Sequence, residues 1–116
     1  VNSANQTLTI TTNSPTGYTT TIIEDGNLRS GSDDINDVTD GSVTLGSEEY
    51  GISTSGAAGQ YNSTDTTITG VAKTIATTST IAISEQTVVT YKAAISGTTV
   101  AGSYSHTVTF TTTANY

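Results

Sequence analysis

Among the residues of this chain that could carry chemistry, the acidic ones come closest to the pattern of a binding site. Eight of the ten Asp and Glu residues lie between Glu24 and Glu49, where Arg29 is the only basic residue. Hard cations such as calcium bind several carboxylate and carbonyl oxygens at once. The segment 25–41 offers such oxygens close together, on Asp33, Asp34, Asn36, Asp37 and Asp40.

The spacing of these residues is not that of an EF-hand. Counted from Asp34, the fifth position is Val38, and no Glu stands at the twelfth. We therefore keep two interpretations of 25–41: a solvated acidic surface loop, or a loop that binds calcium. No other cofactor is suggested by the sequence.

The residues that usually carry catalysis are too few to form an active site. His106 is the only histidine, and the chain has no cysteine. We expect His106 to be a structural residue or to lie at the rim of the fold, and we expect the protein not to be an enzyme.

Lys92 and Asn115 are a candidate pair for an intramolecular isopeptide bond, although Lys92 is predicted to face outward.

Charge and hydropathy exclude two kinds of partner. The net charge is −7, and Lys and Arg together number only three, so the phosphates of a nucleic acid would find little to bind. No apolar run approaches the roughly 20 residues of a spanning helix, so membrane insertion is not expected. The 28 threonines and the scarcity of lysine, with only Lys73 and Lys92, are typical of secreted and cell-surface modules. Asn5 and Asn62 each begin an Asn-x-Ser/Thr glycosylation pattern, so glycans are candidate attachments.

The elements that must position these residues are β-strands. At 6–12, Leu8 and Ile10 share one face and threonines occupy the other, a period of two. The same alternation predicts strands at 80–84, 86–96 and 103–114, and β-branched side chains predict one at 18–24. Further short strands are expected at 42–45, 49–54 and 66–76, although the apolar residues of 66–76 are unevenly spaced. No apolar period of 3.6 residues persists, so little or no helix is expected. The chain is predicted to be all-β, a single antiparallel β-sandwich domain of seven to nine strands over residues 1–116.

Turn residues suggest how these strands pair. Pro15 and Gly17 separate the segments 6–12 and 18–24, which predicts a hairpin between them. Gly97 and Gly102 lie in the connection between 86–96 and 103–114, the two longest alternating segments.

The closing segment resembles a known group of surface proteins. Tyr91 to Ser96, followed by Ala101 to Phe110 with its Ala-Gly-Ser-Tyr and alternating Thr and Val, is similar to the last hairpin of fimbrial subunits and spore-coat-U-like domains. The segments 11–19 and 48–52 resemble Thr-rich surface repeats of the same broad group of secreted bacterial and archaeal β-sandwiches. The resemblance implies an Ig-like, pilin-like fold with a structural role.

Many such subunits are completed by a strand from a neighbouring copy. The chain lacks the Cys pair of chaperone-dependent pilins, but its segment 1–12 alternates as a donor strand would, with Leu8 and Ile10 as the assembly residues. The same segment can instead be the first strand of its own domain. We expect an extracellular filament or cell-surface subunit that assembles with copies of itself. The alternative is a calcium-stiffened adhesin or carbohydrate-binding module that uses Tyr18, Tyr50 or Tyr61 to stack on sugars.

Overall fold

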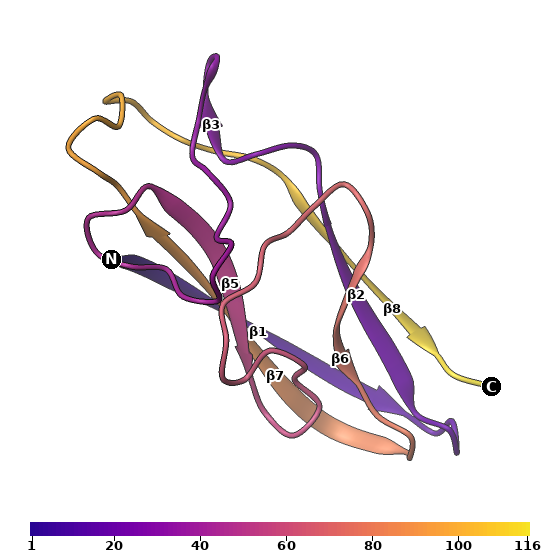
Figure 1. The fold of residues 1–116 in the computed structure, drawn as a ribbon. Coiled ribbons are helices and arrows are strands. Elements are labelled where there is room, and N and C mark those ends of the chain that lie inside the picture. The colour runs from indigo at the N-terminus through magenta and orange to yellow at the C-terminus, as the bar shows by residue number, and fades with distance from the viewer.

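The computed structural model describes residues 1–116 and contains only strands, turns and loops. Its eight strands are antiparallel to their neighbours: β1 Asn2–Thr12, β2 Tyr18–Glu24, β3 Arg29–Ser30, β4 Asp33–Asp34, β5 Glu49–Ser55, β6 Lys73–Thr77, β7 Ala82–Ala94 and β8 Val108–Ala114. The orders β1-β7-β5 and β6-β2-β8 form two three-stranded sheets that face each other (Figure 1). The predicted all-β sandwich of seven to nine strands is confirmed.

β2, the central strand of its sheet, has the most regular burial pattern. In β2, alternate residues from Tyr18 to Glu24 are buried while those between them are partly exposed. This pattern arises because successive side chains of a strand point to opposite faces and only one face of β2 meets the other sheet. Sheet packing therefore fixes which residues of β2 enter the core.

The largest apolar cluster of the protein holds the two sheets together. Ile22 of β2, Ile52 of β5, Ile75 of β6 and Val89 of β7 are each 0% exposed and belong to this cluster. Full burial of such a side chain contributes about 1.5–3 kcal/mol. The β-branched side chains that favour a pleated strand thus also provide the core.

The hairpin predicted around Pro15 and the closing hairpin that the resemblance implies are both wrong. β1 pairs with β7, and β2 pairs with β6 and β8, so the segments before and after Pro15 belong to different sheets. β7 and β8 also lie in different sheets. Each turn carries the chain across the sandwich, which a local turn signal does not distinguish from a hairpin.

Several predicted strand boundaries also change. The segments 80–84 and 86–96 form one strand, β7, whose pairing with β1 is shifted between Ile10 and Thr12. Ser84 in this region has a φ of 48°, which marks a bulge that re-aims the chain. The segment 42–45 is not a strand, and only the end of 66–76 becomes one, as β6.

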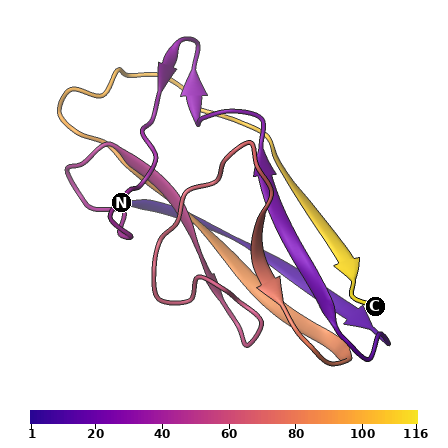
Figure 2. The ribbon, with the colours of Figure 1, turned by 45° about the vertical axis from the view of Figure 1, so that its right-hand side comes forward.

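The acidic segment is not a simple loop. Within 25–41, Arg29 pairs with Asp34 and Ser30 with Asp33 to form the short β3–β4 hairpin. The hairpin stands out beyond the ends of the two main sheets (Figure 2). Beyond it, the chain returns to the sheet, where Val38 donates its backbone N–H to the Tyr50 carbonyl at 2.9 Å.

The segment that follows the β3–β4 hairpin packs closely on β5 at Gly51. A Cβ at Gly51 would lie 2.5 Å from Val38 Cγ1 and 2.9 Å from the Thr66 carbonyl oxygen, whereas a Cβ at Gly97 would meet nothing within 4 Å. We expect Gly51→Ala to lower the free energy of unfolding by about 1–3 kcal/mol, because two segments must move apart. Gly97→Ala is the control and should change it by less than about 0.5 kcal/mol. Urea denaturation measures both; equal effects would contradict this packing.

Candidate functional site

One side of the sandwich is closed by the segment that connects β5 to β6. Ile52 of β5 exchanges two backbone hydrogen bonds of 2.8 Å with Thr66. On β6, the Ile75 carbonyl accepts from Gln60 at 2.9 Å, and Thr77 donates to the Ala58 carbonyl at 3.1 Å. The outer edges of β5 and β6 are therefore covered by the chain itself.

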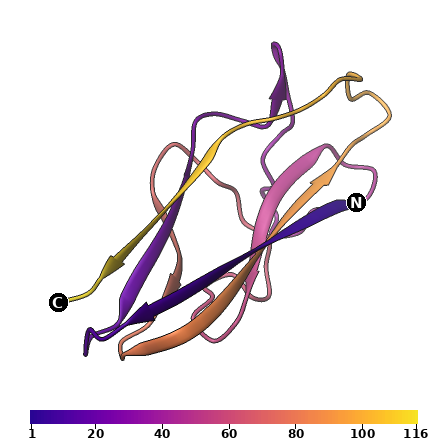
Figure 3. The same cartoon turned by 180° about the vertical axis from the view of Figure 1, so that it is seen from behind.

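The opposite side of the sandwich has two open edges. β1 and β8 are the terminal strands of their sheets, and no backbone hydrogen bond joins their outer edges to another segment. Seen from behind, both lie toward the viewer, with β1 in front of β7 (Figure 3). Unpaired edge strands present rows of N–H and C=O groups that can pair with another chain.

The apolar side chains on this open side are only partly covered. Leu8, Val108 and Phe110 pack against the main core, and Ile10 packs against a second cluster around Tyr18, yet all four are only half-buried. They lie on the inner faces of β1 and β8, where no further strand covers them. The structure thus places Leu8 and Ile10, the predicted assembly residues, against the core of their own chain.

The first half of β1 lies over a shallow apolar hollow. Residues 2–7 are all exposed, although their backbone pairs with β7 as far as Ala93. A hollow of about 220 Å³ lies here, lined by Asn2, Ser3, Ala4, Tyr50, Tyr91 and Ala93. The inner face of the sandwich is therefore accessible at this end.

The five residues predicted to bind calcium do not form a cluster. Asp33 and Asp34 lie on the β3–β4 hairpin, Asp40 accepts a hydrogen bond from its neighbour Ser42 at 3.1 Å, and Asp37 lies beside Tyr50. The Asn36 carbonyl accepts from the Tyr50 N–H at 2.8 Å. No group of three or more His, Cys, Asp or Glu side chains comes together in the structure. The sequence-based calcium site thus has no geometric support as a group of five.

A buried polar cluster was missed by the sequence reasoning. Glu24, at the end of β2, has only 3% of its side chain exposed, and its Oε2 lies 3.7 Å from Nδ1 of His106. The His106 ring is within hydrogen-bond distance of the Gly26 carbonyl, 3.0 Å from Nδ1, and of the Tyr50 hydroxyl, 2.9 Å from Nε2. A neutral imidazole protonated at Nδ1 satisfies both contacts. The prediction that His106 is a structural residue is confirmed by these partners.

Glu24 itself has no hydrogen-bond partner for either carboxylate oxygen. It lines a hollow of about 210 Å³ together with Asp25, Gly26, Asn27, Asp37, Ile68, Thr69 and Gly70. Burial raises the pKa of Glu24, the nearby Asp37 raises it further, and His106 opposes both effects. The signal was present in the sequence, because Glu24 has the same parity as Tyr18 and Ile22 in an alternating strand.

The remaining candidate residues have ordinary surroundings. Asn5 is exposed on β1, and the Asn62 side chain bridges Thr54 and the Gly56 carbonyl. Lys92 contacts Asp65 at 2.7 Å, while Asn115 hydrogen-bonds residues of the β1–β2 turn, so the predicted Lys92–Asn115 pair is wrong.

The tyrosines predicted to stack on sugars are mostly inaccessible. Tyr18 and Tyr50 are 1% and 5% exposed, so neither can offer a ring face to a ligand. Tyr61 is half-buried, and the Lys73 ammonium lies 5.5 Å from its ring centroid. The prediction is therefore wrong for Tyr18 and Tyr50.

No protein-family model, curated protein or solved structure matches this chain. The structure also has no helix that is long and apolar enough to cross a membrane. The geometry described above is therefore the basis for any functional proposal.

The raised pKa of Glu24 predicts that the stability of the fold depends on pH. Its pKa is higher in the folded chain than the ordinary 4.5, so the folded state holds the proton more tightly than the unfolded state. In buffer with a chelator, stability should therefore fall as pH rises from about 4.5 through the raised folded pKa. Glu24→Gln should remove this part of the loss, and Asp40→Asn should retain it. Urea midpoints from pH 4 to 8 measure the difference; identical profiles for wild type and Glu24→Gln would contradict it.

Proposed function

We propose that this protein is a structural subunit of an extracellular filament or cell-surface assembly, in which copies of the chain join by β-strand complementation. The observation that carries the proposal is the asymmetry of the sandwich: one side is closed by the chain itself, while β1 and β8 leave two edges and a half-covered apolar strip open on the other. A strand from a second copy supplies both the backbone partners and the apolar cover that this side lacks.

The composition of the open edges supports the same proposal. Proteins that avoid edge pairing often place lysines or prolines on edge strands. β1 and β8 contain neither, and both are rich in threonine. Neutral hydroxyls keep such an edge soluble without repelling an identical edge on another copy.

Two modes of complementation remain open. In the first, β1 stays on β7 of its own chain, and the neighbour adds to a free edge. In the second, β1 leaves its own sandwich and pairs with β7 of the neighbour, which is strand exchange with an unchanged register. Both modes use the same inner-face residues, Leu8 and Ile10.

Charged residues on the open edges test the proposal. Thr9 on β1 and Thr111 on β8 are exposed. We expect the double variant Thr9→Lys/Thr111→Lys to abolish filaments that the wild-type chain forms, because a buried lysine between strands is costly and two like charges repel. A variant with Thr98→Lys/Gly97→Lys in the β7–β8 connection adds the same charge away from the edges and should assemble normally. Electron microscopy and sedimentation measure assembly; a wild-type chain that stays monomeric under all conditions would refute the proposal.

A disulfide distinguishes the two modes. Thr7 of β1 lies opposite Val88 of β7, on the outer face of the sheet, and the chain has no cysteine of its own. Opposed residues in antiparallel strands are separated by about 4.5–5.5 Å between Cα atoms, which suits a disulfide. Thr7→Cys/Val88→Cys, oxidised as a monomer, should still assemble if neighbours add to free edges. It should assemble only after reduction if β1 is exchanged.

A second candidate function is carbohydrate binding, the alternative drawn from the sequence. The observation in its favour is a hollow of about 300 Å³ lined only by glycine and polar residues: Gly41, Ser42, Ser53, Asn62, Ser63, Thr64, Asp65 and Lys92. Such a lining offers many donors and acceptors to sugar hydroxyls.

Ser63 tests this candidate without disturbing the fold, because it is exposed and its side chain makes no hydrogen bond. If a glycan array detects binding, Ser63→Trp should abolish it by filling the hollow, and Ser63→Ala should retain it. Binding that survives Ser63→Trp would exclude this hollow as the site.

A further inference from the structure

The hollow beside Glu24 has a charge that the chain does not balance. Both Glu24 oxygens are buried and accept no hydrogen bond. An ionised carboxylate taken out of water without a partner costs several kcal/mol, so such groups are normally paired, protonated or bound to a metal. The first step is to ask which cation of this chain could pair with Glu24.

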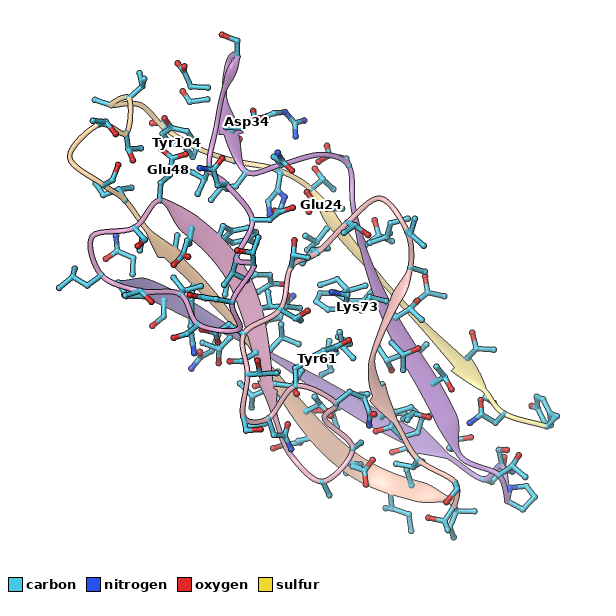
Figure 4. The ribbon with its side chains drawn as sticks, viewed as in Figure 1. Glu24, Asp34, Glu48, Tyr61, Lys73 and Tyr104 are labelled. Carbon is cyan, nitrogen blue, oxygen red and sulfur yellow. The ribbon has the colours of Figure 1, made fainter.

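All three basic residues are engaged elsewhere. Arg29 contacts Asp25 at 3.3 Å, and Lys92 contacts Asp65 at 2.7 Å. The Lys73 ammonium donates to Thr66 Oγ1 at 2.7 Å and to the Thr67 carbonyl. In Figure 4, Glu24 lies near the end of β2, and Lys73 lies apart from it, closer to Tyr61. No lysine or arginine therefore neutralises Glu24.

His106 does not complete the balance. Its Nδ1 is 3.7 Å from Glu24 Oε2, beyond hydrogen-bond distance, and lies only 3.0 Å from the Gly26 carbonyl oxygen, which accepts the hydrogen bond from Nδ1–H. Its other nitrogen is occupied by the Tyr50 hydroxyl at 2.9 Å. The ring thus has its full set of partners in the neutral form.

Two further carboxylates line the hollow: Asp25, which is paired with Arg29 at 3.3 Å, and Asp37. Asp37 lines it together with Glu24, and the Asp37 side chain makes no hydrogen bond or ion pair within the chain. Asp37 raises the pKa of Glu24, because two carboxylates on one small hollow repel each other. A cation between them would relieve both the repulsion and the burial of Glu24.

We propose that this hollow is a calcium site in which Glu24 and Asp37 provide the charged ligands and water completes the coordination. Calcium prefers carboxylate oxygens and tolerates irregular geometry, and a hollow of about 210 Å³ has room for a partly hydrated ion. With only two carboxylates, the affinity falls in the weak range of about 10⁻⁴–10⁻³ M that is usual for extracellular modules.

The site differs from the one that the sequence suggested. Of the five residues predicted on the acidic loop, only Asp37 takes part, and Glu24 comes from the preceding strand. The two ligands join the end of β2 to the segment that packs on β5. Calcium would therefore tie together the two sheets at the end where the β3–β4 hairpin emerges. This inference is independent of filament assembly.

Calcium titration of the whole chain tests the proposal. We expect 10 mM CaCl₂ to raise the urea midpoint of the wild type relative to NaCl of equal ionic strength, which controls for screening of the net negative charge. Terbium luminescence excited through tyrosine reports occupancy of the site directly, and added calcium should displace the terbium and reduce this luminescence. Absence of both a stability shift and calcium-sensitive luminescence in the wild type would overturn the proposal.

Matched variants locate the site. Glu24→Gln and Asp37→Asn each remove one charged ligand with little change of shape, and each should weaken calcium binding by about tenfold or more. Asp33→Asn and Asp40→Asn, on the same acidic segment but outside the hollow, should bind as the wild type does. Asp37 is only partly buried, so Asp37→Asn tests the site even where Glu24→Gln fails to fold. Wild-type affinity in Asp37→Asn, or an equal loss in all four variants, would overturn the assignment.

Discussion

The structure depends on one packing constraint: the inner faces of β2 and β7 must be covered on both sides by flanking strands. Ile22 and Val89, at the centres of these strands, are fully buried because they are flanked in this way. The apolar content of the chain is 33%, which supplies a thin core and little surplus. On one side the segment 56–69 completes the cover, and on the other β1 and β8 end the sheets. The functional proposal follows from this difference between the two sides.

The same constraint explains the acidic hollow. An alternating strand sends every second side chain inward, and at the last position of β2 this side chain is Glu24. At this end of β2 the apolar core is bordered by His106, by Tyr50 and by the acidic segment that contains Asp37. A charged group at the end of the core costs stability in the isolated chain, unless an ion binds there. The fold thus has partly covered apolar side chains along its open side and carboxylates at one end of its core.

The scarcity of basic residues links these two features. Each of the three is held by an oxygen partner, and none lies on the open edge strands β1 and β8 or forms an ion pair with Glu24. Threonine replaces charge as the source of surface polarity, and its hydroxyls pair across strands, as between Thr20 and Thr112 at 2.9 Å. A surface of this kind is polar but carries few charged side chains.

The sequence by itself determined the class of the fold and the parity of its best strands. The alternation around Leu8, Val89 and Val108 correctly separated inward from outward side chains, because a period of two is a local property of the extended chain. It also identified His106 as structural. Only the tertiary structure decided which strands pair, since the choice between a hairpin and a crossing to the other sheet depends on the competition among all strands for the core. For the same reason, only the tertiary structure brought Glu24 to Asp37, because two residues thirteen positions apart meet only when the acidic segment folds back onto β5.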